Sequence, residues 1–305
     1  MRIDEALAGA TEPCFSFEFF PPKTGEGRET LLETVGVLRE LGPTYVSVTY
    51  GAGGATREGT VEISGLIKRK FGIEAMAHLS CVGETVEGLR GVLGGIEAAG
   101  LENVLALRGD PPQGDGEFQR PDGGLDSSAE LAAYISEHFP GFAIGAACFP
   151  EVHPEAASLE ADLGFLKRKV DSGATFLITQ LFFDNRVFFE WLPRVREAGI
   201  DVPILPGIMP IASYAQIRRF CKVCQATIPE PLAAAMEALG GDAEAEQRLG
   251  IAYAARQCEE LLAAGVPGLH FYTLNRWPAT RAIVSALRVA RPWERAQGAP
   301  ASVGG

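Results

Sequence analysis

A single carboxylate lies among aromatic residues near the start of the chain, in residues 14–22 (CFSFEFFPP). Four phenylalanines in six residues predict a buried β-strand, which the two prolines must end. Because side chains alternate along a strand, Glu18 shares one face with Ser16 and Phe20. In apolar company a carboxyl group loses hydration, which raises its pKa and favours the protonated form. Glu18 is therefore a candidate general acid; the alternative is a strand-end carboxylate that pairs with a lysine or faces solvent.

Eight short apolar or β-branched runs, each bounded by turn residues, predict the strands that position this acid. They lie near residues 15–19, 45–49, 75–79, 103–107, 143–147, 176–179, 203–205 and 269–272. Helical patterns between them cover residues 28–41, 60–71, 85–99, 127–138, 159–172 and 185–198. Five of these patterns end in a glycine that suits a helix C-cap. These glycines are Gly42, Gly72, Gly100, Gly173 and Gly199.

A strand followed by a helix, repeated eight times, predicts an α/β fold of the closed (β/α)8 or TIM-barrel type. The seventh crossover is long, and we expect two helices in it, near residues 211–225 and 244–264, one more than the repeat needs. We expect one catalytic domain over residues 1–290 and a flexible tail over 291–305, which is rich in Ala, Pro and Gly. The alternative is an open doubly wound sheet, which should carry a glycine fingerprint after its first strand, where this chain has Pro21 and Pro22.

Composition narrows the classes of partner. The chain has 305 residues, 47% of them hydrophobic, so it can bury a large core, and its formal net charge of −12 argues against nucleic-acid or anionic-membrane binding. The N-terminus has no apolar signal core and no run is long enough to span a membrane, so we expect a cytoplasmic protein.

Six scattered cysteines indicate reduced thiols. Cys221 and Cys224 have zinc-site spacing, but they lie in a helical pattern with no second pair nearby, so we expect packed cysteines and no metal.

Unusual polar residues follow the predicted strands. Barrels of this class build their sites at the carboxyl ends of the strands, so these residues should converge on one rim. Any one of them has a structural alternative: His78 could be a core histidine, and Arg108 and Asp110 a turn pair. Together they are Glu18, Thr49, Tyr50, His78, Arg108, Gly109, Asp110, Glu151, His153, Gln180, Asn275 and Arg276.

The chemistry of this rim is selective. It shows no Ser/His/Asp relay and no metal-ligand spacing. A basic run at residues 167–169 is either a solvated helix face or a contact for phosphate in an otherwise acidic protein. Acid catalysis with anion binding suggests an organic cofactor.

Eight motifs in order along the chain carry a family resemblance. They are residues 16–23 (SFEFFPPK), 47–52 (SVTYGA), 106–112 (ALRGDPP), 150–154 (PEVHP), 169–174 (KVDSGA), 178–184 (ITQLFFD), 205–210 (LPGIMP) and 270–276 (HFYTLNR). From about residue 15 to 287 the chain resembles methylenetetrahydrofolate reductases of the bacterial, single-domain type.

The resemblance implies a flavoprotein oxidoreductase of one-carbon metabolism and methionine biosynthesis. Such enzymes bind FAD noncovalently and work ping-pong: NADH or NADPH reduces the flavin, then 5,10-methylenetetrahydrofolate takes the hydride and becomes 5-methyltetrahydrofolate. Glu18 corresponds to the general acid that protonates folate N10, opening the ring to an iminium. Asp110 would hold the pterin and tune the flavin, and Gln180 would bind folate and nicotinamide in turn.

The resemblance also implies a set of contact residues. Those that would contact FAD are Thr49, Tyr50, Ala52, His78, Arg108, Gly109, Asp110, Phe149, His153, Asp162, Arg168 and Lys169. Those that would contact substrate are Glu18, Asp110, Gln180, Tyr214, Gln216 and Arg276.

The chain departs from the family pattern at two positions. Phe149 stands where relatives can carry tyrosine, and Phe165 where a polar cofactor contact is sometimes found; both could weaken FAD retention.

The chain stops after one barrel, so we expect no control by S-adenosylmethionine. The family's habit suggests a homo-oligomer with small-molecule ligands, and no motif decides between NADH and NADPH. Two alternatives stay open: a non-catalytic flavin- or folate-binding barrel, and a pterin-dependent methyltransferase, which would need zinc or cobalamin.

Overall fold

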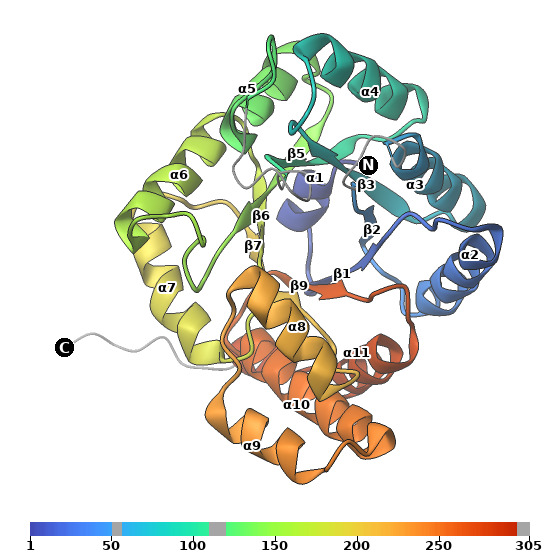
Figure 1. The fold of residues 1–305 in the computed structure, drawn as a ribbon, viewed down its shortest axis with the longest axis vertical. Helices are drawn as coiled ribbons and strands as arrows, with labels where there is room; N and C mark the ends of the chain where they lie inside the picture. Colours follow the sequence, from blue (N-terminus) through green and yellow to red (C-terminus); the bar gives the residue numbers. More distant parts are fainter. Residues whose placement is uncertain (51–56, 110–119, 298–305) are drawn as a thin grey trace.

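The computed structural model describes residues 1–50, 57–109 and 120–297. A ring of helices surrounds a central sheet of parallel strands (Figure 1). The strands are β1 (Cys14–Phe19), β2 (Tyr45–Val48), β3 (Glu74–Ser80), β4 (Asn103–Leu107), β5 (Ala143–Cys148), β6 (Phe176–Thr179), β7 (Ile204–Leu205), β8 (Gly207–Ile208) and β9 (Gly268–Tyr272). The helices are α1 (Ile3–Ala8), α2 (Gly25–Arg39), α3 (Arg57–Phe71), α4 (Val86–Ala98), α5 (Ser128–His138), α6 (Leu159–Asp171), α7 (Asn185–Glu197), α8 (Tyr214–Cys224), α9 (Glu230–Ala238), α10 (Ala243–Ala263), α11 (Pro278–Ala290) and α12 (Trp293–Gln297).

The sheet closes on itself through a strand that proline divides. Strand β7 matches the seventh predicted strand (203–205), whereas β8 follows it after Pro206 and was not predicted. β7 pairs with β6 and β8 pairs with β9, so this one segment joins the two ends of the sheet. Since proline has no N–H to donate, the ladder is interrupted there, while the carbonyl of Pro206 still accepts a hydrogen bond from His270 N at 2.9 Å. The predicted barrel is confirmed.

The crossover helices also follow the sequence prediction. The six predicted before the seventh crossover are all present, with ends no more than three residues from those expected. Each of the five predicted C-cap glycines has a positive φ, from 59° at Gly42 to 113° at Gly173. Glycine is suited to this left-handed backbone because it lacks a Cβ.

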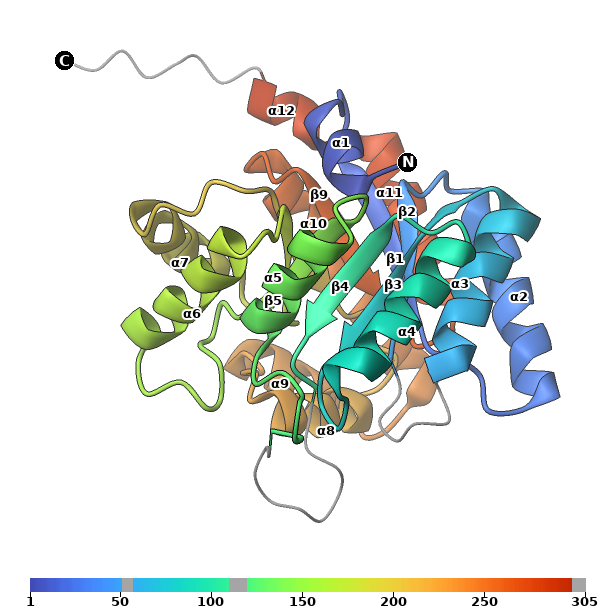
Figure 2. The same ribbon diagram turned by 90° about the horizontal axis from the view of Figure 1, so that it is seen from above.

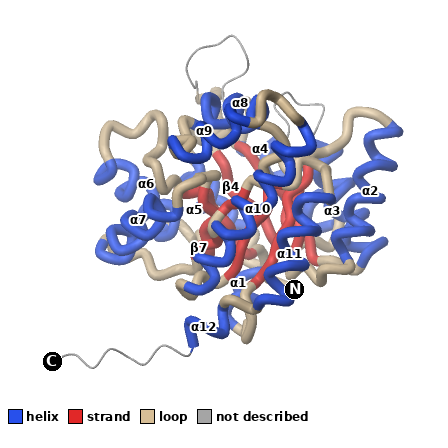
Figure 3. Tube along the Cα trace, turned by 90° about the horizontal axis from the view of Figure 1, so that it is seen from below, coloured by secondary structure: helices blue, strands red, loops and turns tan. Residues whose placement is uncertain are grey.

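Three short helices were not predicted. The seventh crossover holds α8, α9 and α10 where two were expected; α9 begins just after Pro229 and includes Pro231, residues that mark a loop as readily as a helix start. Helix α1 lies with α12 at the end of the barrel opposite α8 and α9 (Figures 2 and 3). Residues 293–297, expected to belong to a flexible tail, form α12, which buries Trp293 against Phe15 with ring centroids 6.2 Å apart.

Alternation along the strands divides the core into two layers. Phe15, Phe17 and Phe19 face the helices and join the outer core. Inward side chains such as Tyr45, Met76 and Phe176 pack with α1 and fill the barrel. Glu18 stands on the inward face of β1, so it opens onto the interior at the carboxyl end of its strand.

Replacing Gly268 with alanine tests how tightly β1 and β9 are joined. A Cβ at Gly268 would lie 2.2 Å from the carbonyl oxygen of Cys14, so one strand must shift. We expect a loss of about 1–3 kcal/mol in the free energy of unfolding, measured by urea denaturation. Gly91→Ala on α4 is the control: its Cβ would meet nothing within 4 Å, and better helix propensity should add about 0.5–1 kcal/mol. Equal urea midpoints for Gly268→Ala and Gly91→Ala would contradict the expectation that β1 and β9 pack too closely to admit a Cβ at residue 268.

Candidate functional site at the barrel mouth

A cavity of about 240 Å³ lies at the carboxyl ends of the strands and contains three of the predicted site residues. Glu18, His78 and Gln180 line it from β1, β3 and the segment after β6. Most of its other lining is apolar. The remaining lining residues are Phe20, Leu105, Leu107, Ala147, Ile178, Leu181, Met209, Phe220, Cys224, Tyr272 and Leu274. Such a cavity suits a flat organic ligand fixed by a few polar groups.

Glu18 is held between two histidines. Its Oε2 atom lies 3.3 Å from His270 Nε2 and 3.5 Å from His78 Nε2, and its side chain is only 12% exposed. Burial alone would raise the pKa of Glu18, but its interactions with His270 and His78 outweigh burial and lower that pKa below its usual value. The expected rise in the pKa of Glu18 is therefore wrong. The histidine partners come from strands distant in sequence, which local composition could not reveal.

His270 extends this contact into a chain of three side chains. Its Nδ1 atom lies 2.8 Å from Ser16 Oγ, so Ser16, His270 and Glu18 form a continuous hydrogen-bonded series. This series is not the nucleophilic Ser/His/Asp relay considered above, because Glu18 faces the cavity and Ser16 is buried behind it. His270 belongs to the motif at residues 270–276, but that motif does not show which residues it contacts. The contact with Ser16 depends on the pairing of these two residues across β1 and β9.

The carboxyl end of β1 is fastened to the segment after β9. Thr273 Oγ1 donates to the carbonyl oxygen of Glu18 at 2.5 Å. The side chain of Asn275 accepts from Phe20 N at 2.8 Å and donates to Phe20 O at 3.0 Å. Asn275 and Leu274 take positive φ angles of 56° and 53°, which turn the Asn275 amide toward β1. These bonds fix the backbone of the acid from both sides.

A second pocket, of about 130 Å³, adjoins the cavity on the side of β4 and β5 and holds cationic groups. Four of the residues expected to contact FAD, Arg108, His153, Asp162 and Lys169, line it together with Ser127 and Ser128 at the start of α5. Lys169 Nζ donates to the carbonyl oxygen of Ala147 at 2.8 Å, and Ala147 also lines the central cavity. The two pockets are therefore neighbours.

Lys169 is a cation without a close counter-charge. Burial lowers its pKa, and within the described chain no carboxylate pairs with its ammonium group. Asp162 lies in the same pocket, but it accepts from the backbone N–H of His153 at 3.2 Å, and burial raises its pKa. Arg108, by contrast, is paired with Glu155 through two bonds of 2.6 and 2.7 Å. An anionic ligand in this pocket would therefore stabilise the charged form of Lys169.

Gly109 lies directly after Arg108 and has a φ of 88°. A Cβ at this position would lie 2.0 Å from Ser80 Oγ and 2.5 Å from Val82. The backbone after β4 therefore passes so close to the segment after β3 that only glycine fits.

A third pocket, of about 220 Å³, contains Gln216 and Arg276, two of the predicted substrate contacts. It lies between the segment after β9 and helices α2, α8 and α11, and it shares Leu274 with the central cavity. Tyr214, the third residue expected here, lines neither: its hydroxyl donates to Glu237 at 3.0 Å and Arg218 lies over its ring. In this structure Tyr214 is held outside the mouth.

Several predicted cofactor contacts line none of these pockets. Arg168 is exposed and stacks over Phe165 at 4.0 Å, on the same helix as Lys169. Phe149 packs edge-on against His153, with centroids 4.5 Å apart. Thr49 and Tyr50 follow β2 as expected, where the Thr49 carbonyl accepts from Thr60 Oγ1. Ala52 and Asp110 lie outside the described residues.

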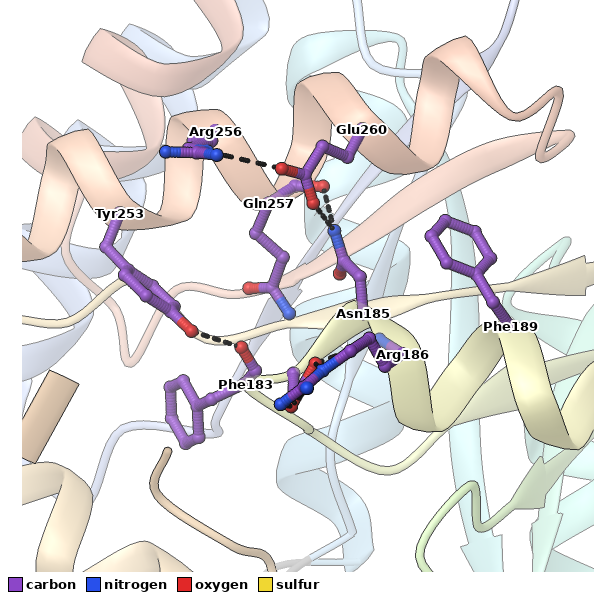
Figure 4. Close-up of a pocket in the computed structure, with 9 residues that line it drawn as sticks. Phe183, Asn185, Arg186, Phe189, Tyr253, Arg256, Gln257 and Glu260 are labelled. Carbon is purple, nitrogen blue, oxygen red and sulfur yellow. Dashed lines mark hydrogen bonds and ion pairs between the residues drawn. The ribbon is translucent and has the colours of Figure 1, made fainter. Parts of the chain in front are cut away.

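A larger cavity, of about 360 Å³, lies away from the mouth between α7 and α10 (Figure 4). Its polar groups bind one another: Asn185 Nδ2 donates to Gln257 O at 3.0 Å and to Glu260 at 2.9 Å, and Tyr253 donates to Phe183 O. These bonds fasten α7 to α10. None of the predicted site residues lines this cavity.

Cys221 and Cys224 lie on α8, as expected, with Cys221 buried and both thiols unbridged. Cys224 lines the central cavity. Over residues 1–50, 57–109 and 120–297, no three His, Cys, Asp or Glu side chains group closely enough to hold a metal ion. No helix in the same residues is long and apolar enough to cross a membrane.

Closed parallel strands, an outer ring of helices and ligand-sized pockets at the carboxyl ends define a (β/α)8 barrel with its site at the mouth. The family model described as Methylenetetrahydrofolate reductase matches residues 2–288. The chain belongs to this family.

Individual relatives agree with this assignment. The 5,10-methylenetetrahydrofolate reductases of Escherichia coli and Salmonella typhimurium are each 40% identical over 274 residues, covering 90% of both chains compared. "Methylenetetrahydrofolate reductase (NADH) 1" of Arabidopsis thaliana is 40% identical over 288 residues, covering 90% of this chain but 49% of the plant protein. The chain therefore spans about half the length of the plant relatives it matches.

Solved structures show the same fold at low identity. An uncharacterized protein from Clostridium thermocellum, described as binding two copies of 5-methyl-5,6,7,8-tetrahydrofolic acid, superposes with a TM-score of 0.65 at 16% identity, covering 95% of this chain and 98% of that one. A dihydropteroate synthase from Coxiella burnetii superposes with a TM-score of 0.53 at 11% identity, covering 92% and 94%. These likenesses concern the fold alone.

Proposed function

We propose that the protein reduces 5,10-methylenetetrahydrofolate to 5-methyltetrahydrofolate, using FAD and a nicotinamide nucleotide in a ping-pong cycle. One observation carries the proposal beyond family membership. A buried carboxyl group and a side-chain amide, Glu18 and Gln180, line one apolar cavity at the barrel mouth. A non-catalytic binding barrel would not need an acid there.

The second pocket fits FAD by the chemistry of its donors. Lys169 offers an ammonium group that lacks a carboxylate partner in the described chain, and this suits a pyrophosphate. The hydroxyl groups of Ser127 and Ser128 and the ring of His153 suit ribose or phosphate oxygens. In the adjoining cavity, His78 Nε2 is buried without a hydrogen bond, so it is available to a flavin ring. When bound, FAD would supply the hydride chemistry.

The residues of the chain would then have separate tasks. Glu18 would deliver a proton to folate N10, so that the C–N bond breaks with its electron pair leaving to nitrogen. The apolar walls of the cavity would exclude water from the reacting carbon. We propose that Asp110, which lies in the family motif at residues 106–112, holds the pterin.

Gln180 is expected to serve both exchanging ligands. Its Oε1 accepts from Leu181 N at 2.9 Å, which leaves the NH₂ group to donate into the cavity. Gln180→Ala should slow both half-reactions by about 10-fold, the cost of one or two hydrogen bonds. Stopped-flow measurement of each half-reaction tests this, and an unchanged nicotinamide step would contradict the shared role.

The finer properties of the family belong to the same proposal. We propose NADH as the donor, because the relatives from Arabidopsis thaliana and Zea mays carry that nucleotide in their names. A role in methionine biosynthesis, a cytoplasmic location and a homo-oligomeric state follow family habit.

The decisive experiment is anaerobic. The purified protein should be yellow, its flavin should bleach with NADH and with NADPH at different rates, and methylenetetrahydrofolate should restore the colour. A flavin that bleaches but is never reoxidised by the folate would indicate a different electron acceptor. A colourless protein that gains no activity from added FAD would refute the proposal.

A further inference from the structure

An exposed aromatic side chain lines the second pocket, and the proposed function gives it no task. Phe165, on α6, is 47% exposed, although it lines the same recess as Lys169. The family pattern places a polar cofactor contact here in some relatives, so a phenylalanine was expected to weaken FAD retention. An aromatic ring at the edge of a polar pocket is, however, a surface on which a flat ligand can stack.

The spacing along α6 places this ring beside the proposed phosphate site. Phe165 and Lys169 are four residues apart, so they share one face of the helix and are separated by about 6 Å along its axis. In every nucleotide a ribose separates the phosphate from the base. A phosphate held at Lys169 would therefore bring the attached base close to Phe165.

The order of groups across the mouth gives the direction in which FAD would lie. Lys169 Nζ donates to the carbonyl oxygen of Ala147, which lines the central cavity, so Lys169 stands on the inner side of the second pocket. Phe165, with its exposed ring, stands on the outer side. FAD has an isoalloxazine ring at one end, a pyrophosphate in the middle and adenine at the other end. With the isoalloxazine ring in the central cavity, adenine is the part that reaches Phe165.

The charges of the second pocket support the same order. Asp162, three residues before Phe165 on the same helix face, lines the pocket. Glu155 lines it too and pairs with Arg108. These carboxyl groups oppose a phosphate beside Phe165, but they are compatible with the uncharged adenine ring, whose amino group can donate to a carboxylate. The phosphates are therefore favoured at Lys169 and the base at Phe165.

Arg168 holds the ring of Phe165 in place. Its guanidinium carbon lies 4.0 Å from the centroid of that ring, within the range of a cation–π interaction. Phe165 lines the pocket and Arg168 does not, so the guanidinium group leaves the pocket side of the ring open. A ring that is already fixed loses less conformational freedom when a ligand stacks on it.

We infer that Phe165 is a specificity-determining residue of the cofactor site: it receives the adenine ring of FAD by stacking and so favours FAD over FMN. This role rests on the proposed function for the presence of a flavin. It reverses the expectation for this position, because the aromatic ring strengthens FAD retention. The alternative is an ordinary surface phenylalanine that touches no ligand.

FAD is FMN extended by an adenosine monophosphate group, so the two flavins together test the adenine contact. Leucine keeps an apolar side chain at residue 165 but removes the ring. We expect Phe165→Leu to raise the dissociation constant of FAD about 10-fold and to leave that of FMN within about twofold, because base stacking on an aromatic ring is lost. Phe165→Trp restores a ring and should bind FAD as the unsubstituted protein does. Fluorescence titration of the flavin-free protein measures each constant.

Phe189→Leu is the matched control. Phe189 is 38% exposed on α7 and lines the cavity between α7 and α10, away from the mouth. Its substitution should change neither dissociation constant. Equal losses of FAD and FMN affinity in Phe165→Leu would show that Phe165 only shapes the pocket, and no loss of either would make it an ordinary surface residue. Both results would overturn the inference.

ADP tests the same contact without a flavin, because it contains adenine, ribose and two phosphates. In isothermal titration calorimetry, Phe165→Leu should weaken ADP binding to the flavin-free protein about 10-fold. ADP that binds the unsubstituted and Phe165→Leu proteins equally would overturn the inference. Failure of the proposed function looks different: the protein would bind FAD and ADP through Phe165 but would not transfer hydride to the folate.

Discussion

Replacing Glu18 with glutamine is expected to abolish the folate half-reaction while leaving the flavin reducible by nicotinamide. Glutamine keeps the shape of the side chain but cannot deliver a proton to the folate nitrogen. General acid catalysis contributes about 10²–10⁴ in rate, so a loss of that size is expected in the folate step alone. The nicotinamide step transfers hydride and needs no acid at this position. Stopped-flow absorbance of the flavin resolves the two steps.

Glu12→Gln is a suitable control, because Glu12 pairs with Arg291 on the surface. Arg291 directly precedes α12, which packs at the end of the barrel opposite the mouth (Figure 2). Both half-reactions should be unchanged in that variant. Equal losses in the two half-reactions of Glu18→Gln would show that Glu18 shapes the site rather than supplying a proton.

The second large effect is expected for Lys169→Met, in the binding of the cofactor. Methionine preserves much of the apolar stem of Lys169 but removes the ammonium group that lines the cationic pocket. Loss of a partly buried charge that contacts an anion costs about 2–5 kcal/mol, so the affinity for FAD should fall on the order of 10²-fold. Fluorescence titration of the flavin-free protein with FAD measures it directly.

Lys167→Met is the matched control on the same helix. Lys167 pairs with Asp171 in solvent and lines none of the mouth pockets. Its substitution should leave the FAD dissociation constant within about twofold, since surface ion pairs contribute little. If Lys169→Met retained FAD as well as Lys167→Met, the phosphate contact would have to be sought elsewhere on the rim.

The barrel could be predicted because its determinants are local. Each strand is a short apolar run, and five crossover helices end at a glycine that takes a positive φ. Local patterns also explain the helices that were not predicted. Pro229 and Pro231 indicate a loop as readily as the start of α9, and the Ala- and Pro-rich composition of the C-terminal stretch gives no sign that Trp293 is buried. The two-residue strand β8, which follows Pro206, was also missed, because it is too short to show an apolar run.

The site could be predicted only in part, because its electrostatics depend on neighbours across the sheet. The rim position of Glu18, His78 and Gln180 follows from strand ends, and one cavity unites them. The direction of the Glu18 pKa shift does not follow, since it depends on His270, 252 residues away. Tyr214, which the resemblance implies as a stacking surface for the exchanging ligands, has its hydroxyl hydrogen-bonded to Glu237, and its role stays a prediction.

The pairing of the first strand with the last has a consequence for how the enzyme is made. Glu18 emerges from the ribosome long before His270 and Thr273, which contact its side chain and its carbonyl oxygen from 252 and 255 residues further along the chain. Until β9 is in place, Glu18 lacks both its contact with His270 and the hydrogen bond to its backbone carbonyl, and β1 has an unpaired edge. A chain that ends before residue 268 therefore contains Glu18 but lacks every contact that Glu18 makes with β9 and the segment after it.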